Sequence, residues 1–274
     1  MVNMRLLTNR REISLEVPCF MGIVNATPDS FSDGGRTAEE CVAHAMALLE
    51  DGADILDIGG ESTRPGAVPV SPDEEIARVV PVIRGIRAAC EERGWALPCL
   101  SIDTYHAETA RVAIDEGVEL LNDIMGMEDP EMVRLARETG VAVCFMHGGR
   151  LAKDRPNRWE NGVIDDVFRY LAERRDALLA AGIKRNRLVA DVGLGFGKTA
   201  EENLELVRNI ERFHELGIPQ LVGHSRKRFL ALVDEDRDAA TEKITVQLLA
   251  AGVQILRLHV LRTPSVRDAK EPRI

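Results

Sequence analysis

The chain has 274 residues, of which 45% are hydrophobic and 29% charged, and it carries a formal net charge of −10 at pH 7. This composition is ordinary for a globular protein with a full core, and the negative charge argues against a nucleic-acid or anionic-membrane surface, because both attract basic proteins. The length allows one large domain or two small ones. A (β/α)₈ barrel needs about 250 residues and would use nearly the whole chain.

Five cysteines are scattered along the chain, and no two of them form a CxxC pair. Cys19, Cys99 and Cys144 lie in apolar runs, which is typical of reduced core cysteines in an intracellular protein. We find no signal peptide and no apolar span of about 18 residues. The sequence therefore predicts a cytoplasmic protein.

The first expected element is a β-hairpin at residues 4–17, in which Leu6, Ile13 and Leu15 flank a turn at Thr8-Asn9-Arg10. It precedes a repeated pattern and would close the amino-terminal end, or bottom, of a barrel. Apolar runs of strand length then recur eight times, at 19–24, 53–58, 99–102, 120–124, 141–146, 188–190, 220–222 and 254–258. The runs are continuous rather than alternating, as expected for parallel strands buried on both faces.

Segments with helical signals lie between these runs. Thr37, Asp129 and Thr199 are expected helix caps, and Ser71-Pro-Asp-Glu74 reads as a capping box. Glycines that match the C-cap position precede seven of the strands: Gly52, Gly94, Gly117, Gly140, Gly182, Gly217 and Gly252. Because no linker interrupts the eight units, we predict a single α/β domain over 1–274, a (β/α)₈ TIM barrel with the short hairpin at its bottom.

Polar residues gather where the predicted strands end. They are Asn25, Asp57, Asp103, Asn122, Asp123, His147, Asp191, Ser225, Lys227, Arg257 and His259, with Arg64 in the second loop. Any one of these aspartates alone could be a helix N-cap, and Arg257 could be a paired structural charge. In a barrel, however, all of these side chains converge on one face, where charges are costly to gather unless a ligand uses them.

Two nucleotide-binding motifs are matched only in part and are rejected. Gly197-Lys-Thr199 resembles the end of a P-loop, but that motif requires glycine at the position of Val192. Gly195-Phe-Gly197 with Ala200 fits a relaxed dinucleotide motif, but the next strand ends in Gly223-His224 and offers no acid for a ribose. The histidines also lack metal-ligand spacing.

A ligand with a donor-rich flat ring and an anionic end fits these residues best. The Asp191 carboxylate can accept two parallel hydrogen bonds from a 2-amino-pyrimidinone edge, and Asp103 and Asn122 can read other polar ring positions. Arg257 can stack on the ring. Arg64 and His259 are then placed for the anion.

At this point the chain resembles the dihydropteroate synthase family of pterin-binding barrels, from about residue 18 to residue 268. The resemblance rests on long motifs in the family's order: Asn25-Ala-Thr-Pro-Asp-Ser-Phe-Ser-Asp-Gly34, Asp57-Ile-Gly-Gly-Glu-Ser-Thr-Arg-Pro-Gly66, Ser101-Ile-Asp-Thr104, Asn122-Asp-Ile124, Gly195-Phe-Gly-Lys198, Ser225-Arg-Lys227 and Arg257-Leu-His259. It implies a transferase that joins 4-aminobenzoate to 6-hydroxymethyl-7,8-dihydropterin diphosphate and releases pyrophosphate. It also implies a homodimer that binds small molecules and neither nucleic acid nor membrane.

The resemblance also implies roles for individual residues. The pterin would be held by Asp103, Asn122, Asp191 and Lys227, with Arg257 on its face, and Met146 and Gly223 complete the substrate-binding set. Asn25, Arg64 and His259 would take the diphosphate, with Mg²⁺ bound through Asn25. The aminobenzoate site would contain Thr63, Arg64, Pro65, Phe196 and Ser225. The expected catalytic residues are Arg64, Asp103, Lys227, Arg257 and His259.

The sequence departs from the family pattern at Val192, at Gly148-Gly-Arg150, at Val260 and in the short tail after Pro264. Two alternatives therefore stay open. One is a related methyltetrahydrofolate methyltransferase-like barrel, which would share the ring contacts but would not need the cations of the last two strands. The other is a catalytically weak paralogue that binds pterins as a non-enzymatic module.

Overall fold

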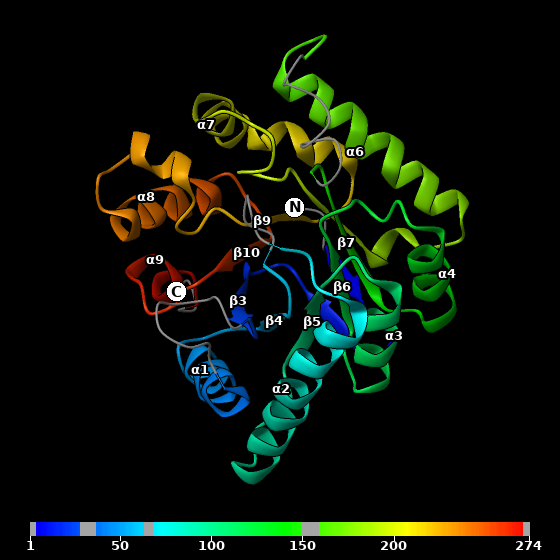
Figure 1. Cartoon of the computed structure of the whole chain (residues 1–274). Helices are drawn as coiled ribbons and strands as arrows, with labels where there is room; N and C mark the ends of the chain where they lie inside the picture. Colours follow the sequence, from blue (N-terminus) through cyan, green and yellow to red (C-terminus); the bar gives the residue numbers. More distant parts are fainter. Residues whose placement is uncertain (1–3, 28–36, 63–67, 149–158, 271–274) are drawn as a thin grey trace.

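Eight parallel strands close into a barrel that helices surround (Figure 1). The computed structural model describes residues 4–27, 37–62, 68–148 and 159–270. The strands follow one another around the barrel in sequence order, and the last pairs with the first. They are β3 (Cys19–Asn25), β4 (Ile55–Gly59), β5 (Cys99–Asp103), β6 (Leu120–Asp123), β7 (Ala142–Met146), β8 (Leu188–Asp191), β9 (Gln220–Val222) and β10 (Ile255–Leu258). The predicted (β/α)₈ fold is confirmed, and its extent as one domain over 1–274 stays a prediction.

The helices are α1 (Ala38–Glu50), α2 (Pro72–Glu92), α3 (Ala107–Asp115), α4 (Pro130–Thr139), α6 (Val163–Ala180), α7 (Ala200–Arg208), α8 (Arg237–Ala250) and α9 (Pro264–Lys270), with 3₁₀ turns η1 (Arg185–Arg187), η2 (Ile210–Leu216) and η3 (Arg228–Leu232). Four of the helices, α1, α2, α4 and α7, begin directly after the predicted caps Thr37, Ser71, Asp129 and Thr199. Thr37 and Thr199 each form a reciprocal capping box. Ser71 caps α2, but the Glu74 carboxylate pairs with Arg78 rather than completing the predicted box. All seven predicted C-cap glycines have positive φ, where other residues are strained.

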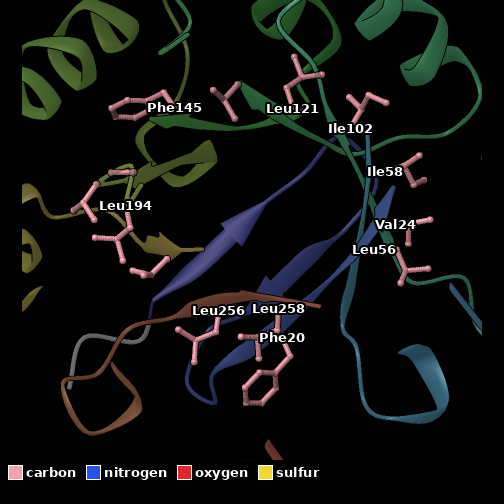
Figure 2. Close-up of a cluster of buried hydrophobic side chains, with 14 of the residues drawn as sticks. Phe20, Val24, Leu56, Ile58, Ile102, Leu121, Phe145, Leu194, Leu256 and Leu258 are labelled. Atoms are coloured by element: carbon pink, nitrogen blue, oxygen red, sulfur yellow. The ribbon is translucent and has the colours of Figure 1, made fainter. Parts of the chain in front are cut away.

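The side chains of the strands divide into two layers, because successive residues point to opposite faces. The outward-facing side chains, such as Phe20, Leu56, Ile58 and Phe145, pack beneath the helices (Figure 2). The inward-facing side chains at the start of the strands form a separate apolar cluster, in which Met21, Ile55 and Leu120 meet. The barrel is therefore filled with apolar side chains at its bottom, and its upper interior is left to other residue types.

The amino-terminal hairpin closes the bottom of the barrel, as predicted. Strand β1 (Arg5–Leu7) pairs antiparallel with β2 (Glu12–Ser14), and Leu6 is fully buried in the inner apolar cluster. The buried Glu119 carboxylate accepts from Thr8 Oγ1 at 2.8 Å and from Arg11 Nε at 2.9 Å. An apolar side chain and a buried ion pair thus fix the hairpin to the barrel.

All five cysteines are free and buried, among them Cys19, Cys99 and Cys144, which were predicted to be reduced core residues. Among the described residues, no helix has both the length and the apolar character that crossing a membrane requires.

Candidate active site

The polar residues predicted at the strand ends lie on one rim of the barrel. The register of the strands pairs Asn25 with Gly59, Gly59 with Asp103, and Asp103 with Asn122. These positions have the same parity as the inward-facing residues below them, such as Ile55 and Cys99. The carboxyl ends of neighbouring strands therefore direct Asn25, Asp103 and Asn122 toward the mouth of the barrel.

Asp57, fully buried on β4, joins two of the predicted site residues, Arg257 and Asn122. Its Oδ2 accepts from Arg257 Nε at 2.6 Å and from Asn122 Nδ2 at 3.0 Å, and its Oδ1 accepts from Ser101 Oγ at 2.5 Å. Arg257 Nη2 also donates to Asp103 Oδ2 at 2.7 Å. Two carboxylates thus hold the Arg257 guanidinium across the mouth of the barrel, although β10 lies far from β4 and β5 in the sequence.

The charges of this first group depend on one another. Burial raises the pKa of Asp103, and the Arg257 guanidinium opposes that rise. Burial alone would lower the pKa of the Arg257 guanidinium. The Asp57 and Asp103 carboxylates more than offset this effect, so that the pKa lies above its usual value. Arg257 is therefore a permanent cation, and it stabilises the ionised form of Asp103.

A second group surrounds Asp191 at the end of β8. Asp191 Oδ1 accepts from Gly193 N at 2.8 Å. Lys227 Nζ donates to the carbonyl of Leu194 and lies 4.9 Å from the centre of the Phe196 ring. Burial raises the pKa of Asp191, and Lys227 opposes that rise. Burial also lowers the pKa of Lys227 to about 8, against the attraction of Asp191.

A third group lies at the ends of β9 and β10. Ser225 Oγ accepts from His259 N at 3.3 Å and lies 3.1 Å from His259 Nδ1. Gly223 leaves room beside Arg257, since a Cβ there would lie 3.7 Å from the Arg257 Cβ and Cδ atoms. Met146 is paired in register with Asp191. The structure thus brings every predicted site residue that it describes to the same rim.

Three predicted residues, Thr63, Arg64 and Pro65, lie outside the described residues. Asn25, the predicted Mg²⁺ ligand, is partly exposed at the end of β3. Among the described residues, no hydrogen bond involves its side-chain amide, and no cluster of three metal-binding side chains occurs. One amide oxygen suits Mg²⁺ that is otherwise bound by water and substrate phosphates, since Mg²⁺ rarely uses a cage made only of protein.

Asp57 was grouped with the polar residues at the strand ends but was given no role in the site. The signal was its parity: Asp57 lies two residues after Ile55 and two before Gly59, so it faces the barrel interior. Of the residues that depart from the family pattern, Val192 is buried beneath the helices, and Val260 is 39% exposed. Arg150 lies outside the described residues.

The comparisons with known proteins agree with this geometry. A profile of pterin binding enzymes matches residues 21–259. The chain belongs to the pterin-binding enzyme family.

Individual members of the pterin-binding enzyme family are similar over nearly their whole length. A dihydropteroate synthase of Haemophilus influenzae is 39% identical over 266 residues, which cover 93% of this chain and 94% of that protein. The dihydropteroate synthase of Xanthomonas albilineans with 4-aminobenzoic acid superposes with a TM-score of 0.86 at 38% identity, covering 98% of this chain and 96% of that one. The complex of the Xanthomonas albilineans enzyme with 7,8-dihydropteroate superposes with a TM-score of 0.81 at 34% identity, covering 97% of this chain and 95% of that one.

Proposed function

We infer that this chain is a transferase that carries out the dihydropteroate synthase reaction. It condenses 4-aminobenzoate with 6-hydroxymethyl-7,8-dihydropterin diphosphate to give 7,8-dihydropteroate and pyrophosphate. The observation that carries this function is the convergence of Asp103, Asn122, Asp191, Lys227 and Arg257 on one rim of a barrel of this family. Curated relatives and solved complexes of the same enzyme support it.

The hydrogen-bonding groups on the rim match a pterin ring. Asp57 accepts hydrogen bonds but cannot donate them when ionised, so Asn122 must turn its amide nitrogen toward Asp57. Its amide oxygen then faces the site as an acceptor. Together with the Asp103 and Asp191 carboxylates, it provides three acceptors for the ring's N–H groups, and Lys227 provides a donor for the ring carbonyl.

Arg257 is placed to cover one face of the pterin. Its guanidinium is fixed by Asp57 and Asp103, so little conformational entropy is lost when a ring stacks on it. A cation on a ring face contributes about 0.5–2 kcal/mol. The same charge favours departure of the anionic diphosphate.

The diphosphate would lie beside His259 and Ser225, with Arg64 and Asn25 as further contacts. Asn25 would hold Mg²⁺, which would supply positive charge beside the leaving diphosphate. In the reaction, the bond between the methylene carbon and the diphosphate oxygen breaks, and the oxygen keeps the electron pair. The amine nitrogen of aminobenzoate forms the new bond to that carbon and then loses a proton.

The aminobenzoate amine is nucleophilic at neutral pH, so the reaction needs no strong general base. Phe196 and Ser225 are the described residues placed for this substrate, and Thr63 and Pro65 are further expected contacts. Phe196 lies against Lys227 and would form an aromatic wall next to the pterin site. The two substrates would then meet above Asp191 and Lys227.

The test is product formation by the purified chain with both substrates and Mg²⁺, followed by chromatography of dihydropteroate and release of pyrophosphate. Asp191→Ala removes a charged acceptor, so we expect pterin affinity to fall by about 1.5–3 kcal/mol, roughly 10- to 150-fold. Pterin binding without any product would favour the non-enzymatic paralogue. Complementation of a synthase-deficient bacterium gives an independent readout.

We also propose that the protein is a cytoplasmic homodimer. Five free, buried cysteines suit a reducing compartment. Leu232 on η3 and Val246 on α8 are 55% and 53% exposed, and a subunit contact would remove this apolar surface from water. Sedimentation equilibrium of the wild type and of Val246→Asp tests the dimer, and a wild-type monomer at micromolar concentration would contradict it.

A further inference from the structure

Lys198 is a half-buried lysine to which the proposed reaction assigns no role. Its Nζ lies 3.0 Å from His147 Nδ1 and donates to the carbonyl oxygens of Gly193 at 2.9 Å, of His147 at 3.2 Å and of Phe196 at 3.2 Å. All four of these contacts are to neutral atoms. Burial lowers the pKa of Lys198 to about 7, and the Asp191 and Glu202 carboxylates oppose that fall from farther away. Burying the charged form of this amine is costly, so its contacts must offset that cost.

The contacts of Lys198 close the loop between β8 and α7 on itself. Gly193, Gly195 and Gly197 all have positive φ, with values of 68°, 81° and 62°. A glycine-rich loop of this kind has many accessible conformations, and ordering it costs entropy. Because Lys198 binds two of the loop's own carbonyls, it selects one of these conformations. In that conformation the Phe196 ring lies 4.9 Å from Lys227 Nζ.

Through its contact with His147, Lys198 also links the loop between β8 and α7 to the end of β7. Burial, reinforced by Lys198, lowers the pKa of His147 to about 3, so its ring is neutral and Nδ1 accepts from the ammonium. The ring meets Tyr170 edge-on, with centroids 5.0 Å apart, and tilts against Trp159 at 5.9 Å. Trp159 Nε1 in turn donates to Glu202 in the first turn of α7, at 2.7 Å.

We propose that Lys198 is a positioning residue for the aminobenzoate site, which it sets by holding Phe196 against Lys227 through the loop between β8 and α7. The inference rests on the proposed function, because it takes Phe196 as a wall for that substrate. Asp191 and Lys227 of the pterin site touch the same loop, at Gly193 N and at the Leu194 carbonyl, but the part of that site formed by Asn122 and Arg257 does not. Asn122 and Arg257 are fixed by Asp57, which belongs to a separate hydrogen-bonded group.

The test compares Lys198→Met with Lys243→Met. Methionine has about the length and apolar stem of Lys198 but lacks the ammonium. The matched control is Lys243, an exposed lysine on α8 that pairs with Asp234. For Lys198→Met we expect the KM for 4-aminobenzoate to rise at least tenfold. The affinity for pterin-6-carboxylate, measured by calorimetry, should change less than threefold. Lys243→Met should leave both values unchanged.

A purely structural lysine would give a different result. Its replacement would lower the melting temperature and the active fraction, and the KM for aminobenzoate would stay unchanged. That outcome overturns the proposal, and so does an equal loss of affinity for aminobenzoate and for the pterin. If Lys198→Met does not fold, His147→Phe tests the proposal instead. This variant keeps the aromatic packing and removes one acceptor of the Lys198 ammonium. We expect it to raise the same KM about threefold, and no change contradicts the inference. An inactive wild type would instead refute the proposed reaction.

Discussion

Asp57 shows how a single buried residue organises the binding rim. It is fully buried and bonds to Arg257, Asn122 and Ser101. None of these bonds reaches the mouth of the barrel directly, so Asp57 acts through the residues that would touch a ligand. Its carboxylate offsets the Arg257 charge and fixes the direction of the Asn122 amide.

We predict that Asp57→Ala destabilises the protein by about 3–5 kcal/mol, because it removes one partner of a buried ion pair and leaves the other uncompensated. Ser101→Ala is the control, since it removes a neutral donor from the same carboxylate and should cost about 1 kcal/mol. Urea unfolding measures both values. A loss below 1 kcal/mol for Asp57→Ala would show that Asp103 alone can balance Arg257.

His224 gives a pH-dependent prediction. It is fully buried at the end of β9 and hydrogen-bonds with Thr245 Oγ1 at 2.9 Å, and burial lowers its pKa to about 4. As pH falls below 6.5, His224 becomes protonated in the unfolded chain but stays neutral in the folded one. The free energy of unfolding therefore decreases until pH reaches about 4. Between pH 7 and pH 5 this loss is about 2 kcal/mol.

Replacing His224 by Gln removes the titrating group, so the stability difference between the wild type and His224→Gln should shrink by that amount between pH 7 and pH 5. Urea titrations at a series of pH values measure it. A pH-independent difference would mean that His224 keeps an ordinary pKa in the folded state.

The candidate site could be predicted residue by residue to different extents. Asn25, Asp103 and Asp191 each end an apolar run, and a strand end is visible in the sequence. Asp57 was grouped with these residues but given no role, because it lies two positions before the end of its strand and its partners come from other strands. The role of Lys198 could not be foreseen, because its acceptors are carbonyl oxygens, and carbonyl directions depend on backbone angles that the sequence does not specify.

At the scale of elements, apolar runs and glycine C-caps located every strand of the barrel to within two residues at either end. Four of the differences, all at the carboxyl ends of strands, have a common cause. β3, β4, β5 and β8 extend one residue beyond their predicted ends, to Asn25, Gly59, Asp103 and Asp191. Backbone pairing continues regardless of side-chain polarity, so hydrophobicity marks where the interior becomes polar rather than where the strand ends.

The hairpin supplies a prediction for one element. Leu6→Ala removes a fully buried side chain from the inner cluster and should cost about 2–5 kcal/mol of unfolding free energy. Ile13→Ala, on the partner strand and only partly buried, should cost less. Catalytic constants of both variants should match the wild type, because the hairpin closes the end of the barrel opposite to the binding rim. Lower kcat with an unchanged melting temperature would contradict this separation.

At the scale of the whole molecule, stability and binding occupy opposite ends of the barrel. Apolar side chains fill the lower interior, and the charged groups lie above them. Distant sites without shared partners contribute additively. The effect of a ligand on stability should therefore be independent of substitutions at the bottom.

We predict that a pterin at 100 times its dissociation constant stabilises the wild type by about 2.7 kcal/mol, and Leu6→Ala by the same amount. Asp191→Ala should lose most of this gain at the same ligand concentration. Thermal-shift titrations at fixed protein concentration compare the three proteins. A smaller shift for Leu6→Ala than for the wild type would reveal coupling through the barrel.

The pairing of β10 with β3 has a consequence for how the protein is made. A ribosome synthesises β10 last of the eight strands, so a growing chain that already contains β3 to β9 still has two unpaired sheet edges. Open edges pair readily with other chains. Nascent and truncated chains that lack residues 255–258 should therefore aggregate and need chaperones, whereas the finished barrel leaves no edge open among its eight strands.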